Sequence, residues 1–207
     1  MKNLLAIFVV ITTSVIFGFG QNATEKTVIC TNDTVEKISS RGIKIGSKLD
    51  DILNLFASTE EEKQRIRNSA SGPKRTKVGY EFFSAQPKLN DEKFVGISNY
   101  TFEFLDNRLA GFSVGYAKPK WKDVSQFTEK LAEIFNLPNV ENWNTQPSGT
   151  KSIQCENYLV STQVLNNQND SSSVFGIYDS QLGQIIEKRE RKSEETQREE
   201  DIKTFKP

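Results

Sequence analysis

Residues 100–116 read YTFEFLDNRLAGFSVGY, and this stretch decides the class of fold. Every second residue of 100–104 is aromatic, and Asp106-Asn107 then supplies residues typical of a tight turn. The same period of two continues through residues 112–116 on the far side of the turn. Such alternation is typical of half-buried strands, so we expect an antiparallel hairpin with an aromatic inner face.

Helices are expected before this hairpin. Ser47 is placed to cap a helix, and the residues after it form one apolar stripe at helical spacing: Leu49, Ile52, Leu53 and Phe56. Ser58-Thr59 opens a second, very polar helix over residues 60–68. Alternation over residues 78–83 then predicts a first strand.

A comparable series follows the hairpin. Asp123 has the position of a helix cap, and Asn136 with Pro138 has the chemistry of a helix end. The residues expected on the buried side of this helix are Val124, Phe127, Leu131, Ile134 and Phe135. Strands are expected afterwards at 152–155, 158–165 and 174–178.

These elements predict an α+β fold with helices packed on one face of antiparallel sheet. The domain spans residues 42–187, and internal similarity suggests two tandem helix–strand–hairpin units, 42–120 and 121–187. In this alignment Phe56 matches Phe135, and Phe102 matches Phe175. Residues 181–187 would then return as a strand. The alternative is a single sheet in which the matching segments are coincidental.

The ends of the chain have different compositions. Residues 1–20 combine Lys2, an apolar run and Gly18-Phe19-Gly20, which is typical of a cleavable signal peptide, so the mature chain is expected to begin near Gln21. An uncleaved anchor is the rival interpretation. Residues 21–41 are expected to form a polar leader, and residues 188–207 a charged tail that is helical or disordered. No other stretch is apolar enough to span a membrane, which favours a secreted or periplasmic location.

Cys30 and Cys155 are the only cysteines in the chain. A pair of cysteines in an exported protein predicts a disulfide, because the compartment is oxidising. The alternative is two separate buried thiols.

Composition excludes several classes of function. The chain has no histidine, which removes Ser-His and Cys-His nucleophile pairs and histidine metal sites. Its 27 basic and 27 acidic residues form no long basic stripe, so no nucleic-acid partner is expected. The acidic clusters lack the spacing of a calcium loop, and we assign no catalytic, cofactor or metal residues. Trp121 is expected to pack over a helix start, and Trp143 to be more exposed in a loop.

The segment Gly42-Ile-Lys-Ile-Gly-Ser-Lys-Leu-Asp-Asp-Ile52, followed by aromatic strands, resembles known helix–sheet modules. Its part from Gly46 to Ile52 is similar to the opening of outer-membrane assembly lipoproteins of the SmpA/OmlA type, with Ser47-Lys48 in place of Met-Thr. A tandem of such units also resembles the β-lactamase inhibitor protein family. The resemblance implies a small α+β envelope or secreted module that binds other proteins and performs no chemistry.

The function expected from the sequence is therefore that of an exported, non-catalytic module binding a protein or a cell-envelope component. Inhibition of a secreted enzyme is a special case of such binding. A hydrolase that uses carboxylates or serine without histidine is the alternative, and an apolar cleft with two convergent, pKa-shifted carboxylates would favour it.

Overall fold

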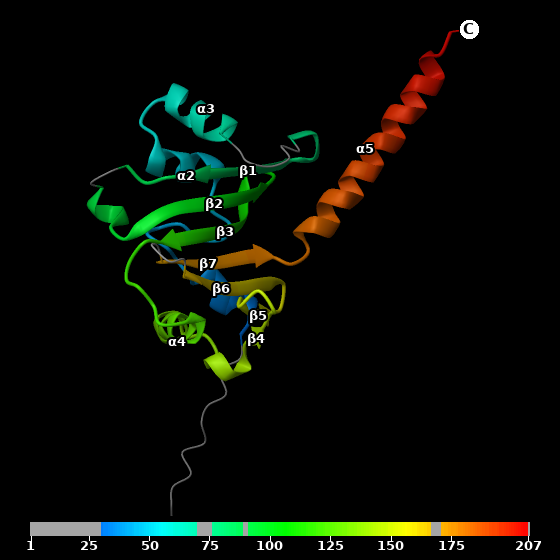
Figure 1. Ribbon diagram of the computed structural model, residues 1–207. Helices are drawn as coiled ribbons and strands as arrows, with labels where there is room; N and C mark the ends of the chain where they lie inside the picture. The colour runs from blue at the N-terminus through cyan, green and yellow to red at the C-terminus, as the bar shows by residue number, and fades with distance from the viewer. Residues whose placement is uncertain (1–29, 70–75, 89–90, 167–170, 207) are drawn as a thin grey trace, which may run out of the picture.

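A seven-stranded antiparallel sheet forms the centre of the computed structural model, which describes residues 30–69, 76–88, 91–166 and 171–206 (Figure 1). The strands lie in the order β1-β2-β3-β7-β6-β5-β4. Their bounds are β1 Tyr80–Ala85, β2 Ile97–Leu105, β3 Arg108–Tyr116, β4 Asn144–Thr145, β5 Lys151–Cys155, β6 Tyr158–Asn166 and β7 Ser171–Asp179. The expected signal peptide, residues 1–20, lies outside the described residues.

Five α-helices accompany the sheet within the described part of the chain: α1 Asn32–Glu36, α2 Leu49–Phe56, α3 Glu60–Asn68, α4 Val124–Phe135 and α5 Leu182–Thr204. Short 3-10 turns lie at Thr76–Val78, Glu92–Phe94 and Val140–Asn142. Residues of α1, α2 and α4 share one core with a single face of the sheet, and Ile66 of α3 packs against the same core. The predicted α+β class is confirmed.

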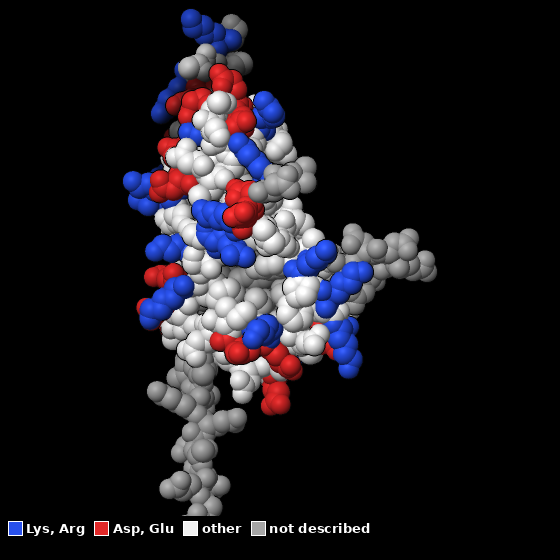
Figure 2. All heavy atoms as spheres, turned by 90° about the vertical axis from the view of Figure 1, so that its left-hand side faces the viewer, with Lys and Arg blue, Asp and Glu red and all other residues white. Residues whose placement is uncertain are grey.

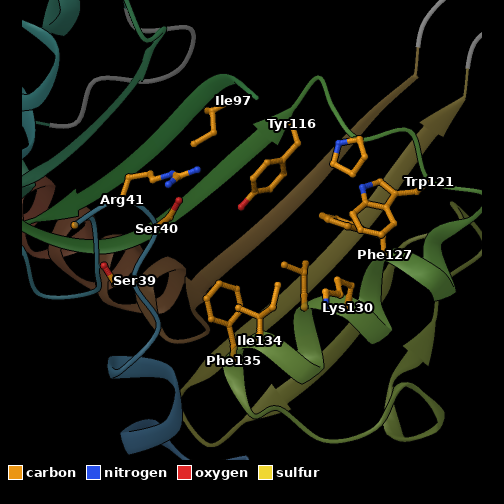
Figure 3. Close-up of a pocket in the computed structure, with 13 residues that line it drawn as sticks. Ser39, Ser40, Arg41, Ile97, Tyr116, Trp121, Phe127, Lys130, Ile134 and Phe135 are labelled. Atoms are coloured by element: carbon orange, nitrogen blue, oxygen red, sulfur yellow. The ribbon is translucent and has the colours of Figure 1, made fainter. Parts of the chain in front are cut away.

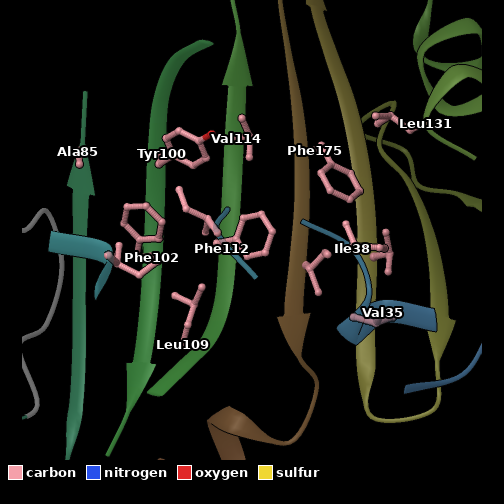
Figure 4. Packing of buried hydrophobic residues seen from close by; sticks show 14 of the residues in the cluster. Val35, Ile38, Ala85, Tyr100, Phe102, Leu109, Phe112, Val114, Leu131 and Phe175 are labelled. Atoms are coloured by element: carbon pink, nitrogen blue, oxygen red, sulfur yellow. The ribbon is translucent and has the colours of Figure 1, made fainter. Parts of the chain in front are cut away.

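The hairpin over residues 100–116 is confirmed as β2 and β3. Asp106 and Asn107 both have positive φ, 50° and 61°, which is the backbone of a two-residue turn that matches strand twist. Phe102 pairs with Phe112 across the hairpin, and both side chains are fully buried. Figure 4 shows the next row on the same face, in which Tyr100, Val114 and Phe175 lie on adjacent strands.

The apolar stripe of α2 is buried as expected, since Leu49, Ile52, Leu53 and Phe56 are all at most 5 % exposed. The predicted Ser47 cap is wrong. Lys48 is the N-cap residue and gives no side-chain cap bond, whereas the Ser47 hydroxyl accepts a hydrogen bond from the Lys44 amide. Ser47 therefore closes the preceding turn. The Asp123 cap of α4 is confirmed, because its carboxylate accepts a hydrogen bond from the Gln126 amide.

The described part of the expected leader, residues 30–41, belongs to the core. Thr31 and Thr34 form a capping box that starts α1, and Val35 and Ile38 are at most 1 % exposed. The sequence does not predict that Val35 and Ile38 are buried, because they lie in a short polar segment without an apolar stripe at helical spacing. They pack beside β6 and β7 in Figure 4.

Residues 181–187, predicted as a returning strand, instead begin α5. Leu182 and Ile186 of its first turns are buried against Val78 and Tyr80, on the sheet face opposite the main core. Arg189 then donates two hydrogen bonds to the Asp106 carboxylate, at 2.7 and 2.8 Å. Beyond this contact α5 projects away from the sheet (Figure 1). The helix continues to Thr204, so the predicted charged tail is helical up to that residue.

The sheet consists of two meanders, each of which follows a helix: three strands, β1-β2-β3, and four strands, β4-β5-β6-β7. Their last strands, β3 and β7, pair at the centre. The sequence alignment of Phe102 with Phe175 is nevertheless wrong. Phe102 lies on β2, a middle strand that turns back into β3, whereas Phe175 lies on β7, which leads into α5. The two aspartates that guided the alignment occupy different kinds of turn.

Candidate functional site

A cavity of about 720 Å³ lies where the end of β3 meets α4 and the turn over residues 39–42 (Figure 3). Most of its lining is apolar: Ile97, Tyr116, Pro119, Trp121, Phe127, Leu131, Ile134 and Phe135. The polar lining residues are Ser39, Ser40, Arg41 and Lys130, together with the backbone of Gly42. We call this cavity the α4 pocket. Its size is in the range of small-ligand sites.

One wall of the pocket is the apolar stripe of α4. Phe127 and Leu131 are 2 % and 6 % exposed, but Ile134 is 59 % exposed. The prediction that Ile134 is buried is therefore wrong. The stripe is wider than the contact between α4 and the sheet, so its outer residue lines the pocket instead (Figure 3).

The second wall is formed by Trp121, whose ring lies 5.3 Å from that of Phe127. This confirms the expectation that Trp121 packs over the first turn of α4. Its indole Nε1 is buried, and neither it nor the buried Ser173 hydroxyl has a hydrogen-bond partner among the described residues. Ser173 pairs in register with Tyr116, so both orphaned groups adjoin the pocket lining.

Trp143 does not contribute to this site. It is 4 % exposed, and its Nε1 donates a hydrogen bond of 2.9 Å to the Pro138 carbonyl. The expectation of an exposed loop tryptophan is therefore wrong. A buried indole with its donor satisfied is a core residue.

Arg41 is carried into the pocket by a tight turn. Ser40 and Ile43 exchange two backbone hydrogen bonds, of 2.9 and 3.0 Å, around Arg41 and Gly42. Both enclosed residues have positive φ, 56° and 92°, and glycine at the second position meets this requirement without steric cost. The turn directs the guanidinium of Arg41 toward the hydroxyl of Tyr116 (Figure 3).

Hydroxyl groups surround this polar end. Ser40 Oγ lies 3.0 Å from Tyr100 Oη, and burial raises the pKa of Tyr100 to about 12. Burial also raises the pKa of Tyr116, although its hydrogen bond with Ser40 and the charge of Arg41 oppose that effect. Tyr116 therefore stays protonated at neutral pH and remains a hydrogen-bond donor.

The two cations of the pocket differ in their partners. Lys130 forms an ion pair of 2.8 Å with Glu133 on the next turn of α4. Within the described residues Arg41 has no carboxylate at ion-pair distance, and no acidic side chain lines the pocket. The polar end of the pocket thus carries one uncompensated positive charge.

A second surface is the sheet face opposite the main core. Strand register places one row of small and polar residues across five strands: Thr101, Ser113, Gly176, Ser161 and Ser152. In the adjacent row Glu103 lies beside Gly111 and Tyr178, and burial raises the pKa of its carboxyl. Among the described helices, α5 covers the corner of this face near Tyr80, and we call the remainder the open sheet face.

The acidic clusters noted in the sequence do not converge. Asp106 pairs with Arg189, whose hydrogen bonds lower the pKa of this carboxyl, while hydrogen bonds at the start of α3 lower the pKa values of Glu61 and Glu62. Glu103 lies on a different face of the sheet from the α4 pocket. Among the described residues, no three cysteine, histidine or acidic side chains are grouped to hold a metal ion.

The side of the molecule seen in Figure 2 carries intermixed acidic and basic side chains, without a large patch of one sign among the residues described there. Within the described part of the chain, no helix is both long enough and apolar enough to cross a bilayer. Comparisons with protein-family models, with curated proteins and with solved structures find no match to this chain. The resemblance to envelope modules therefore remains a prediction.

Proposed function

We propose that this chain is an exported, non-catalytic module that binds an apolar component of the cell envelope in the α4 pocket. The observation that carries the proposal is the exposed apolar wall, in which Ile134 is 59 % exposed beside the buried Phe127 and Leu131. Covering apolar surface contributes about 25 cal/mol per Å². A ligand that covers this wall would gain binding energy that the isolated chain leaves unused.

The chemistry of the pocket supports binding over hydrolysis. Its polar groups are hydroxyls, a guanidinium and an ammonium, and Tyr116 is held protonated by burial. Among the described residues, Glu103 is the one carboxyl whose pKa burial clearly raises, and it lies on the opposite face of the sheet, where it cannot act on a ligand in this pocket. A general base within reach of the ligand would be needed for hydrolysis.

The test uses the neutral fluorescent probe N-phenyl-1-naphthylamine with protein comprising residues 21–207. We expect saturable binding with enhanced probe fluorescence. The Ile134→Glu variant should weaken binding at least about tenfold, because it places a charge on the apolar wall. Ile202→Glu on α5, where the native side chain is 67 % exposed, is the matched control and should bind like the unchanged protein. Equal binding by both variants would refute the proposal.

Protein binding through the open sheet face is the second candidate function, and it includes inhibition of a secreted enzyme. The row from Thr101 to Ser152 consists of small and polar residues, of which Ser113 and Ser152 are buried. Glu103 in the adjacent row has no ion pair among the described residues. A pull-down from envelope extract would test it with a Ser161→Arg variant, because Ser161 lies inside the row, between Gly176 and Ser152. Partners retained equally by this variant would exclude the face as the interface.

A further inference from the structure

We propose that the ligand of the α4 pocket is an amphiphile with a single carboxylate, of the class of fatty acids, whose head binds between Arg41 and Tyr116. This inference rests on the proposed function, since it assigns the ligand class of the same pocket. It is carried by the separation of polar and apolar groups within the cavity (Figure 3).

The head position follows from Arg41. Its guanidinium points toward the pocket and lacks a carboxylate partner among the described residues. A guanidinium presents a planar fork of N–H donors that matches a carboxylate with two parallel hydrogen bonds. One unpaired positive charge is complementary to one negative charge, so a singly charged head fits this end of the pocket.

Arg41 also has an unusual backbone. The left-handed region is sterically unfavourable for a residue with a Cβ, and asparagine or glycine would be better suited to φ 56°. The arginine side chain therefore occupies a position for which local backbone preference selects other residues. Such a conflict between local preference and residue choice is typical of functional positions.

Hydroxyl donors complete the head site. Tyr116 is oriented toward Arg41 in Figure 3, and its hydroxyl remains protonated because burial raises its pKa. A protonated phenol donates a hydrogen bond to a carboxylate oxygen. Ser40, which is 7 % exposed and within 3.0 Å of the Tyr100 hydroxyl, holds this polar corner in place.

The tail position follows from α4. Ile134 and Phe135 form an apolar surface that leads away from Arg41, and Trp121 with Phe127 closes its far side (Figure 3). Leu131 of the same helix also lines the pocket. Lys130 is the weaker candidate for the head site, because it already has a carboxylate partner, Glu133, at 2.8 Å. A linear apolar chain anchored at Arg41 therefore meets apolar side chains along its length.

Competition against bound N-phenyl-1-naphthylamine tests the ligand class with three probes of equal chain length: dodecanoate, dodecan-1-ol and dodecylamine. At pH 7.5 we expect dodecanoate to displace the probe at about tenfold lower concentration than dodecan-1-ol, the effect of one charge-assisted hydrogen-bonded contact. Dodecylamine should be the weakest. Equal displacement by all three, or preference for the amine, would overturn the carboxylate assignment while leaving apolar binding in the pocket intact.

Arg41→Asn provides the decisive variant, since asparagine tolerates the left-handed backbone and should not impair folding. It should abolish the preference for dodecanoate over dodecan-1-ol and leave binding of the neutral probe unchanged. Lys44→Gln removes an equal charge from the same segment outside the pocket lining and should retain the preference. A preference that survives in Arg41→Asn would refute the assignment of the head site. Absent binding of the neutral probe would refute the proposed function itself.

Discussion

Cys30 and Cys155 form a disulfide, with their Cα atoms 4.7 Å apart across a separation of 125 residues. The bond joins the residue before the cap of α1 to the last residue of β5, and Cys155 is fully buried. It confirms the pairing expected from the sequence. Because α1 also packs into the core, the disulfide reinforces a segment that already contributes Val35 and Ile38 to the fold.

Loss of this disulfide should strongly destabilise the protein. In the chain-entropy model, opening a loop of this length costs about 5 kcal/mol in the free energy of unfolding. The Cys30→Ser/Cys155→Ser double variant and the reduced protein should show this loss in denaturant titration. Without reductant, a thiol-alkylating reagent should label neither cysteine. A double variant within about 1 kcal/mol of the parent would contradict the prediction.

The base of α5 should matter to stability far more than the rest of the helix. Ile186→Ala should lower the free energy of unfolding by about 2 kcal/mol, the low end for a buried isoleucine, because its cluster is small. Deleting residues 190–207 should leave the denaturation midpoint nearly unchanged, since these residues are mostly exposed. A large loss on truncation would instead reveal packing or self-association of the distal helix.

Two phenylalanines that the sequence treated as equivalent should differ. Phe56 is 5 % exposed and contacts the rings of Phe94, Tyr100 and Phe102, so Phe56→Ala should cost about 3–5 kcal/mol. Phe135 is only partly buried, stacking on Phe175 while lining the α4 pocket. Phe135→Ala should therefore cost clearly less. Equal losses in chemical denaturation would show that the pocket wall is as firmly packed as the core.

Glu103→Gln should stabilise the protein in a pH-dependent way. Burial raises the pKa of this carboxyl above its unfolded value, so the folded state binds the proton more tightly. The charged form therefore penalises folding, and stability falls as pH rises from the unfolded pKa through the folded one. The melting temperature of Glu103→Gln should be higher than that of the parent protein at pH 7, and the difference between the two should shrink toward pH 4. A constant difference across this range would exclude the mechanism.

Alternating aromatics and helix caps made much of the fold predictable. Residues 100–116 specify a hairpin locally, because strand period and turn chemistry agree, and Asp123 likewise marks the start of α4. Residues 181–187 misled the prediction since Ile185-Ile186 fits a strand as well as a helix. The choice depends on Val78 and Tyr80, which lie about 100 residues earlier and form the surface that Leu182 and Ile186 cover.

The α4 pocket was less accessible from sequence. The apolar stripe of α4 is evident in the sequence. The exposure of Ile134 is not, because it depends on how much of that stripe the sheet covers. Arg41 falls in the segment whose composition predicts a polar leader, and the alternation of residues 112–116 predicts only that Tyr116 belongs to the hairpin. The proposed head site depends on the tight turn at Arg41-Gly42, and this turn is recognisable only from the pairing of Ser40 with Ile43 in the structure.

Methyl NMR of the protein comprising residues 21–207, titrated with dodecanoate, tests the central claim most directly. Binding in the α4 pocket predicts that the methyl resonances of Ile97, Leu131 and Ile134 shift together with one dissociation constant. Leu159 and Val174 on the open sheet face should remain unperturbed. Absence of shifts in the pocket methyls, or shifts confined to Leu159 and Val174, would contradict the assignment of the pocket as the ligand site.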